Sequence, residues 1–321
     1  MGNIVSRVRR SLPELPRLVQ TKKPGSNGKM TQRRGSRISV LQVAMLVLRG
    51  FLVALVFLTP ALLLPEISQD IAQGVTFLAI LAAIVVVTEY SAAYPGLIEF
   101  RDAKPYNRTR FVLFFVIVVS VTLLQREIML ATDSMTLFAS FAVALGNLLD
   151  FSFSPVALLV ASLPPGLSIE HLMIVQVSAA LSYTLSLVGL FIFLVGLAFG
   201  YWPRRTEIFN VWVNLPNFDP TKGVDIVQRL ERDAQINVAL GIIMPFSLPA
   251  LLHLSSFLVQ PVTLETQLAL VWGVSLWAFI PVSLVMRGVA MYRVAQLIRA
   301  QRRRVAEAQD AVPLPPQSAY S

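Results

Sequence analysis

The sequence contains no cysteine, only two histidines and few charged residues. The missing cysteine excludes disulfide bonds, thiolate metal sites and cysteine nucleophiles from these 321 residues. With His171 and His253 alone, we expect no histidine-built metal cluster and no bound cofactor. Charged residues form 14% of the chain, against about one quarter of an ordinary soluble domain, and apolar residues form 55%. This composition is typical of a membrane protein.

The motifs that mark common enzymes are also missing. The sequence has no Walker loop, no HExxH zinc motif, no nucleophile elbow, no GxGxxG loop and no pair of intramembrane aspartates. An enzyme interpretation therefore has no catalytic constellation to rest on. The sequence favours a protein without catalytic activity.

Six apolar runs are assigned as membrane spans, because a hydrocarbon core about 30 Å thick needs about 20 helical residues to cross it. They cover residues 43–64, 71–88, 111–125, 171–202, 236–259 and 267–286. The first two are joined by a short turn and form a helical hairpin. The sequence thus predicts an all-α fold, a polytopic transmembrane helical bundle.

A seventh apolar stretch, 134–163, is interrupted by Gly146, Asn147, Asp150 and Pro155. Thirty residues cannot make two full crossings, so we interpret it as a broken re-entrant or surface-lying hairpin on the outer side. In a competing seven-span interpretation this stretch is one kinked crossing. That arrangement would place the 203–235 loop and the basic tail outside, against the usual distribution of lysine and arginine.

The lysines and arginines predict the topology, because cytoplasmic segments near span ends are enriched in them. Residues 1–37 hold ten, the 89–110 loop four, the 203–235 loop five and the tail from Arg287 six. We therefore expect both termini in the cytoplasm and the protein in a bacterial inner (plasma) membrane. The predicted divisions are a disordered basic arm (1–37), the transmembrane domain (38–290) and a basic helical extension with a Pro-rich tail (291–321).

The basic arm predicts contact with anionic membrane lipids, since each basic residue near such a surface adds about 1 kcal/mol of attraction. The arginines of the C-terminal extension act in the same way; they are Arg299, Arg302, Arg303 and Arg304. An acidic protein partner is the alternative. Nucleic acid is not expected, because the arm has no aromatic residue to stack on bases.

Charged residues at membrane depth are costly and are candidate functional sites. Arg49 and Glu89 lie at similar distances from the turn that joins their two helices. We expect either a structural ion pair between them or an Arg49 that reaches the headgroups without a partner.

On the outer side, polar candidates lie at the end of the third span and at the tip of the broken hairpin; they are Arg126, Glu127, Asn147 and Asp150. A solute site is one interpretation. The other is that Asn147 and Asp150 cap two short helices. His253 follows Pro245 and Pro249 in a span that should be kinked, and such a histidine is more often a hydrogen-bonded interior residue than a proton relay.

The 203–235 loop ends in a predicted amphipathic helix, 221–235, with Val227, Leu230 and Ala234 on one face. That face suits the membrane surface or a protein partner. Two functions follow. The favoured function is that of an interaction, assembly or scaffold component of a membrane complex, and that complex can be a homo-oligomer. The alternative is a small secondary transporter or channel that uses the broken outer hairpin.

Overall fold

The computed structural model describes residues 40–65, 67–93, 96–101, 104–130, 135–200, 214–215, 225–255 and 262–310. The chain divides into two units, 1–40 and 41–321, and the described helices belong to the second unit apart from the first residue of the first helix. The predicted arm at 1–37 and the Pro-rich end at 313–321 lie outside the described residues.

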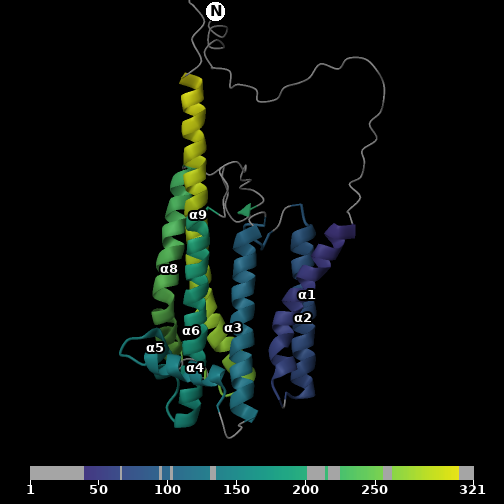
Figure 1. Ribbon diagram of the computed structural model, residues 1–321, viewed down its shortest axis with the longest axis vertical. Helices are drawn as coiled ribbons and strands as arrows, with labels where there is room; N and C mark the ends of the chain where they lie inside the picture. The colour runs from purple at the N-terminus through teal and green to yellow at the C-terminus, as the bar shows by residue number, and fades with distance from the viewer. Residues whose placement is uncertain are drawn as a thin grey trace, which may run out of the picture. The chain divides into compact units, whose positions relative to one another are not determined.

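Helices account for all regular structure in the described residues, which contain no strand. They are α1 (Val40–Leu63), α2 (Gln69–Ser91), α3 (Lys104–Leu130), α4 (Leu137–Leu148), α5 (Pro155–Ala161), α6 (Ile169–Ala198), α8 (Ile226–Ser255) and α9 (Gln267–Asp310), as Figure 1 shows. Six of them are long and apolar enough to cross a membrane. The predicted all-α polytopic fold is confirmed, and the chain is a multi-pass integral membrane protein.

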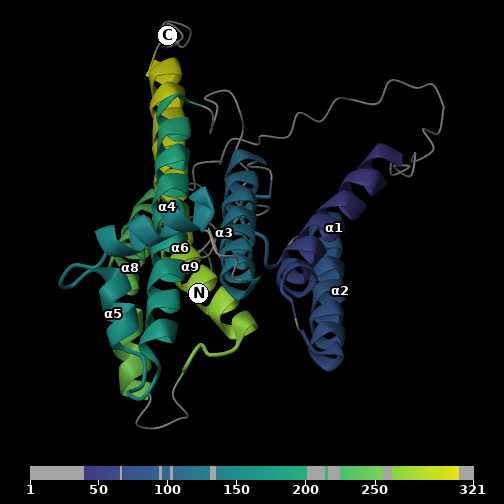
Figure 2. The ribbon, with the colours of Figure 1, turned by 60° about the horizontal axis from the view of Figure 1, so that its bottom comes forward.

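Helices α3, α6, α8 and α9 form the packed bundle, and both ribbon views show them side by side (Figures 1 and 2). Small residues let the helices approach closely. Ser178, Ser182 and Ser186 of α6 lie four residues apart and are all fully buried, so they form a packing face. Gly189 of the same helix faces Leu113 of α3.

Helix α8 packs closely on the backbone of α9 at Gly241. A methyl group added there would lie 2.5 Å from the carbonyl oxygen of Pro281, a backbone atom that cannot move aside. We expect Gly241→Ala to lower the free energy of unfolding by about 1–3 kcal/mol, as overpacking does. Titration of the detergent-solubilised protein with SDS, followed by circular dichroism, measures this change.

Gly196→Ala is the matched control, because Gly196 also lies in a span and no atom lies within 4 Å of its added methyl group. Alanine there should be neutral or stabilise the helix by up to about 1 kcal/mol. Equal stability of the two variants would show that α8 and α9 are not in contact at Gly241.

Helix α9 has 44 residues and, at about 1.5 Å per residue, is about 66 Å long. Its distal half pairs with the start of α8 through two ion pairs of 2.7 Å, Arg299 with Glu231 and Arg302 with Asp225. The hydrogen bond from Arg302 lowers the pKa of Asp225. The two helices thus continue past the bundle as a stalk, which we define as Asp225, residues 226–235 of α8 and residues 289–310 of α9.

The described part of the predicted 221–235 helix is the beginning of α8, which runs without a break from Ile226 into the fifth span; residues 221–224 lie outside the described residues. Val227, Leu230 and Ala234 are buried where α8 packs on α9, with at most 3% of each side chain exposed. The apolar face on which a partner was predicted is therefore occupied by the chain's own α9. A partner at this helix stays a prediction and would have to contact its charged side.

The 134–163 stretch forms a broken hairpin of α4 and α5, as predicted. These helices have 12 and 7 residues, about 18 and 10 Å, and neither can cross a core about 30 Å thick. Helices α3 and α6 run antiparallel, with Leu113 against Gly189 and Gln125 bonded to Ser178, so the stretch between them begins and ends on one side of the bundle. The seven-span interpretation is therefore wrong. Thr136 and Ser154 cap the two helices, and Gly146 of α4 packs against Val177 of α6. The hairpin lies against protein, which satisfies its irregular backbone.

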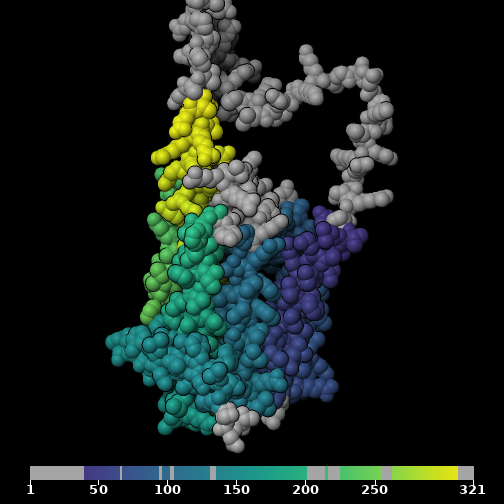
Figure 3. Space-filling model, viewed as in Figure 1, coloured from purple at the N-terminus to yellow at the C-terminus, as the bar shows by residue number. Residues whose placement is uncertain are grey.

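Helices α1 and α2 form the predicted helical hairpin, with Gly50 of α1 against Ala83 and Val87 of α2. Most large side chains of this pair are exposed, as expected of lipid-facing helices. One contact with the bundle is aromatic: the rings of Phe57 and Trp272 of α9 are 5.4 Å apart. Figure 3 shows α1 next to α3, and the α4–α5 hairpin on the other flank of the bundle.

Candidate functional site: an arginine-lined cavity

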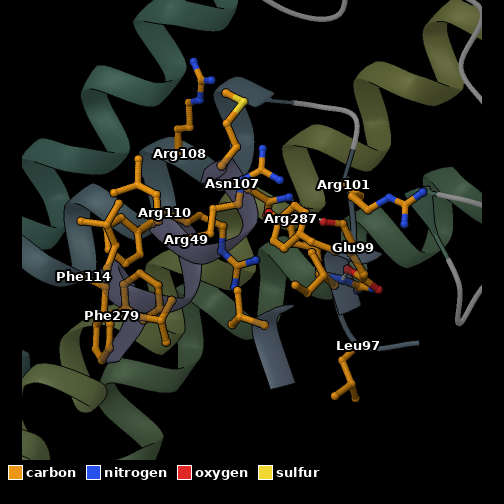
Figure 4. Close-up of a pocket in the computed structure, with 18 residues that line it drawn as sticks. Arg49, Leu97, Glu99, Arg101, Asn107, Arg108, Arg110, Phe114, Phe279 and Arg287 are labelled. Carbon is orange, nitrogen blue, oxygen red and sulfur yellow. Dashed lines mark hydrogen bonds and ion pairs between the residues drawn. The ribbon is translucent and has the colours of Figure 1, made fainter. Parts of the chain in front are cut away.

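A cavity of about 700 Å³ lies where α1 and α2 meet α3 and α9 (Figure 4). We call it the arginine cavity, because its described lining contains five arginines and a single acidic residue. The charged residues are Arg49, Arg101, Arg108, Arg110, Arg287 and Glu99. Its volume falls within the range of about 300–1,000 Å³ that is usual for small-molecule sites.

Helical periodicity explains why these side chains all line the cavity. Residues three and four apart share one face of a helix. The face of α1 that lines the cavity consists of Met45, Leu48, Arg49, Leu52 and Val53, and that of α3 of Asn107, Arg108, Arg110, Phe111 and Phe114. Arg49 thus interrupts an apolar stripe, and Arg110 begins one.

The loop 96–101 forms a wall of the cavity. One side chain that precedes the loop in the sequence and one that follows it hold it in place. One carboxylate oxygen of Glu89 accepts hydrogen bonds from the backbone N–H groups of Gly96, Leu97 and Ile98, at 2.9, 2.8 and 3.2 Å. The side-chain amide of Asn107 donates to the backbone carbonyls of Glu99 and Phe100, at 3.0 and 2.9 Å. The wall is therefore fixed before any ligand arrives.

Phe100 anchors the same loop in a strained conformation. Its φ is +53°, in the left-handed region that costs a residue other than glycine about 1–2 kcal/mol. The side chain is fully buried, and its ring lies 4.6 Å from that of Tyr106. Burial of this ring stabilises the backbone conformation that places Glu99 at the cavity.

Glu99 neutralises one of the five arginines. Its two carboxylate oxygens accept from Nε and Nη2 of Arg287, at 2.5 and 2.7 Å. Both side chains are largely buried, with 13% of Glu99 and 27% of Arg287 exposed. This bidentate geometry is the strongest form of a carboxylate–guanidinium pair, and it uses both oxygens of the only acid in the described lining.

None of the other four arginines pairs with a carboxylate in the part of the chain that the structure describes. Arg49 lies over the ring of Tyr90, 4.2 Å from its centroid. Arg101 donates to the carbonyl of Ala92. Arg108 has no hydrogen bond or ion pair to a described residue. Arg101 also interacts electrostatically with Glu89. The lining therefore holds four guanidinium groups that have no carboxylate within 4 Å among the described residues.

Arg110 is the best positioned of the four. Its Nη2 donates to the hydroxyl of Ser283 on α9, and its guanidinium lies 5.2 Å from the ring of Tyr106 and 6.0 Å from that of Phe279. Its Nε is buried and has no hydrogen-bond partner among the described residues. The hydroxyl of Tyr106, whose ring lies beside this guanidinium, is also buried without a hydrogen-bond partner among the described residues, so the two polar groups face the same buried region.

The opposite side of the cavity is apolar. The rings of Phe114 and Phe279 lie 4.7 Å apart and continue into Phe111, Leu52 and Val53. Figure 4 shows these two rings on one side of the cavity and Glu99 and Arg101 on the other. The cavity is therefore amphipathic, with a cationic end and an apolar end.

The cationic end lies at one boundary of the hydrocarbon core. The stretch of α3 from Arg110 to its far end at Leu130 and the stretch of α9 from Arg287 back to Gln267 are each about 30 Å long, at about 1.5 Å per residue. This length matches the thickness of the core, which is about 30 Å. By these lengths Arg110 and Arg287 fall at one boundary of the core, and Phe114 and Phe279 fall inside it.

The predicted pairing of Arg49 with Glu89 is wrong, because each has another partner. Arg49 stacks on Tyr90 and lines the cavity, while Glu89 binds the backbone of the 96–98 segment. The lengths of the apolar runs indicate the depth of both residues but not the direction in which each side chain points around its helix.

The outer candidates do not come together in a pocket. Glu127 accepts from the backbone N–H and the hydroxyl of Thr136, at 2.9 and 2.7 Å, and so fixes the start of α4. Arg126, Asn147 and Asp150 are exposed, and none of these residues lines the arginine cavity. The side-chain caps predicted at Asn147 and Asp150 are supplied instead by Thr136 and Ser154.

Of the two histidines, His253 is exposed near the end of α8 and lies outside the cavity. His171 has its Nε2 3.0 Å from the carbonyl oxygen of Thr263. Among the described residues no cluster of histidine, aspartate and glutamate is suited to hold a metal ion. Neither histidine belongs to the arginine cavity.

Sequence reasoning missed Arg101, Arg108, Arg110 and Arg287 as site residues. In the sequence all four serve as topology signals, which place them at one boundary of the membrane. The sequence offers one further signal, since Arg110 directly precedes one predicted span and Arg287 directly follows another. That pattern indicates a common depth, but contact between the two helices comes only from the fold.

No family model matches this chain, and neither curated proteins nor solved structures include a match to it. A function for the protein therefore rests on the chemistry of the arginine cavity.

Proposed function

We propose that the protein binds an anionic membrane lipid, with the headgroup among the arginines of the cavity and the hydrocarbon chain along its phenylalanines. The observation that carries this proposal is the described lining of five arginines against one carboxylate at the boundary of the hydrocarbon core. Basic pockets between membrane helices suit lipid phosphates in this way.

Electrostatics and geometry support a phosphate-bearing headgroup. A guanidinium is planar and offers several donors, which match phosphate oxygens two at a time. Arg110 is held in place by Ser283 and two aromatic rings, so little side-chain freedom is lost when an anion binds. The apolar end adds a second attraction, since hydrocarbon chains and phenylalanine rings prefer one another to water.

The proposed topology places this site in the cytoplasmic leaflet of a bacterial plasma membrane. Six crossings bring both chain ends to one side, and the distribution of lysine and arginine supports the cytoplasm as that side. The arm at 1–37 then attracts anionic lipids to the surface from which the cavity is filled.

Lipid-dependent stability tests the proposal. We expect dioleoylphosphatidic acid to raise the Tm of the protein purified in mild detergent, and dioleoylphosphatidylcholine to leave it unchanged. Arg110→Gln should weaken the apparent affinity for the anionic lipid at least tenfold, which is about 1.4 kcal/mol. Native mass spectrometry of the purified protein counts the lipid that remains bound.

Arg304→Gln is the control for net charge, because Arg304 is an exposed residue of α9 far along the helix from the cavity. It removes the same charge about 25 Å along α9 from Arg287, so it should not change the affinity of the cavity, whatever contact Arg304 makes with other headgroups. The proposal fails if both substitutions weaken binding equally, or if the zwitterionic lipid binds as tightly as the anionic one.

An assembly role is the second candidate, and the stalk supports it. Helix α9 continues to Asp310, and Val305 on it is 51% exposed in a segment beyond the predicted span 267–286. Purification from native membranes with the stoichiometry of every co-purified protein tests this role. The transport alternative gains no support from the outer hairpin, since its polar residues are exposed and the arginine cavity lies at the other end of α3.

A further inference from the structure

The described polar lining of the arginine cavity offers many hydrogen-bond donors and few free acceptors. Arg49, Arg101, Arg108 and Arg110 are donors only, since a guanidinium has no acceptor. Both oxygens of Glu99 are already bonded to Arg287. A headgroup that fits must therefore supply acceptors and carry few donors of its own.

Donor-bearing headgroups do not meet this requirement. The ammonium of an ethanolamine headgroup would stand among four guanidinium groups, and the described lining has no free carboxylate to receive it. A glycerol headgroup carries hydroxyl donors that need acceptors. The acceptors that the described side chains still offer are the amide oxygen of Asn107 and the hydroxyl of Tyr90. Bare phosphate oxygens meet the requirement without this cost.

The charge count sets a second requirement. Four positive charges remain in the described lining after the Glu99–Arg287 pair, and a phosphodiester headgroup brings a single negative charge. A terminal phosphate or a diphosphate brings two or three. Because charges near the hydrocarbon boundary are weakly screened, the ligand that neutralises more of the lining binds more tightly.

We infer that the cavity selects lipids with a terminal phosphate or diphosphate group over singly charged phosphodiester lipids. This inference rests on the proposed function and names the class of headgroup. The donors carry the selection, and Arg110, which Ser283 holds in place, is the best positioned of them.

Lipids with identical dioleoyl chains isolate the headgroup in the test. We expect dioleoylglycerol diphosphate to bind the purified full-length chain about tenfold more tightly than dioleoylphosphatidylglycerol, measured by competition in native mass spectrometry and by the shift in Tm. Raising the salt concentration should weaken the diphosphate more than the diester. Arg110→Gln and Arg108→Gln should each reduce the tenfold preference, and Arg304→Gln should leave it intact.

Inorganic diphosphate separates a headgroup site from a site for soluble phosphates, and we expect it not to compete with the lipid at equal concentration. If it does compete, the ligand is a soluble diphosphate and the lipid assignment is overturned. If phosphatidylglycerol binds as tightly as the diphosphate lipid and both respond to Arg110→Gln, the inference fails while the proposed lipid site stands. If no anionic lipid responds to Arg110→Gln, the proposed function fails with it.

Discussion

Replacing Leu230 by asparagine is expected to lower the free energy of unfolding by about 4 kcal/mol in the purified protein, with no partner present. Leu230 is fully buried between α8 and α9 in the stalk. The substitution leaves a cavity, which costs about 2–5 kcal/mol for a large aliphatic side chain, and buries an amide without an acceptor. Unfolding in SDS followed by circular dichroism measures the loss.

Val305→Asn is the matched control, since Val305 is an aliphatic residue of the stalk that is 51% exposed. It should change stability by less than about 0.5 kcal/mol. A Leu230→Asn variant as stable as the wild type, but without a protein that otherwise co-purifies, would show that this face docks a partner and that the packing of α8 on α9 is wrong.

Replacing Glu99 by glutamine is expected to lower the free energy of unfolding by about 3 kcal/mol. The change leaves the guanidinium of Arg287 unpaired in a largely buried position, and breaking such a pair from one side costs about 3–5 kcal/mol. Because part of Arg287 is exposed to solvent, we expect the loss in free energy of unfolding to lie at the low end of that range. Thermal unfolding in detergent without added lipid measures it.

The double variant Glu99→Gln, Arg287→Met should recover most of this loss, because removal of both charges leaves nothing unpaired. The single variant has a second signature. It adds one unpaired positive charge to the cavity, so an anionic lipid should stabilise it more than it stabilises the wild type. A Glu99→Gln protein with unchanged stability and unchanged response to lipid would show that the pair does not form.

The transmembrane architecture was predictable because its signals are local. About twenty apolar residues in a row specify a span whatever surrounds them, and the glycine and proline in 134–163 break that stretch in any context. Membrane depth is predicted from local signals in the same sense, since the run lengths alone placed Arg49 and Glu89 near one boundary.

The errors concern which face of a helix meets which neighbour. The stripe of Val227, Leu230 and Ala234 has the same period whether it meets lipid, a partner or α9. Its true neighbour is the distal half of α9, which follows a whole further span along the chain. Four spans and the broken hairpin separate Glu99 from Arg287 in the sequence, and no local pattern links a loop to a helix across them. The cavity could therefore not be assembled from the sequence.

The length of α9 determines how far from the lipid the chain can act. Arg287 stands at the boundary of the hydrocarbon core, and the helix from there to Asp310 adds about 35 Å. The headgroup layer takes up about 5–8 Å of that height, so the last turns of α9 stand about 25–30 Å clear of the bilayer surface. A single helix, α9, therefore connects Arg287, which lines the arginine cavity, to a distal surface that is accessible only to water-soluble molecules.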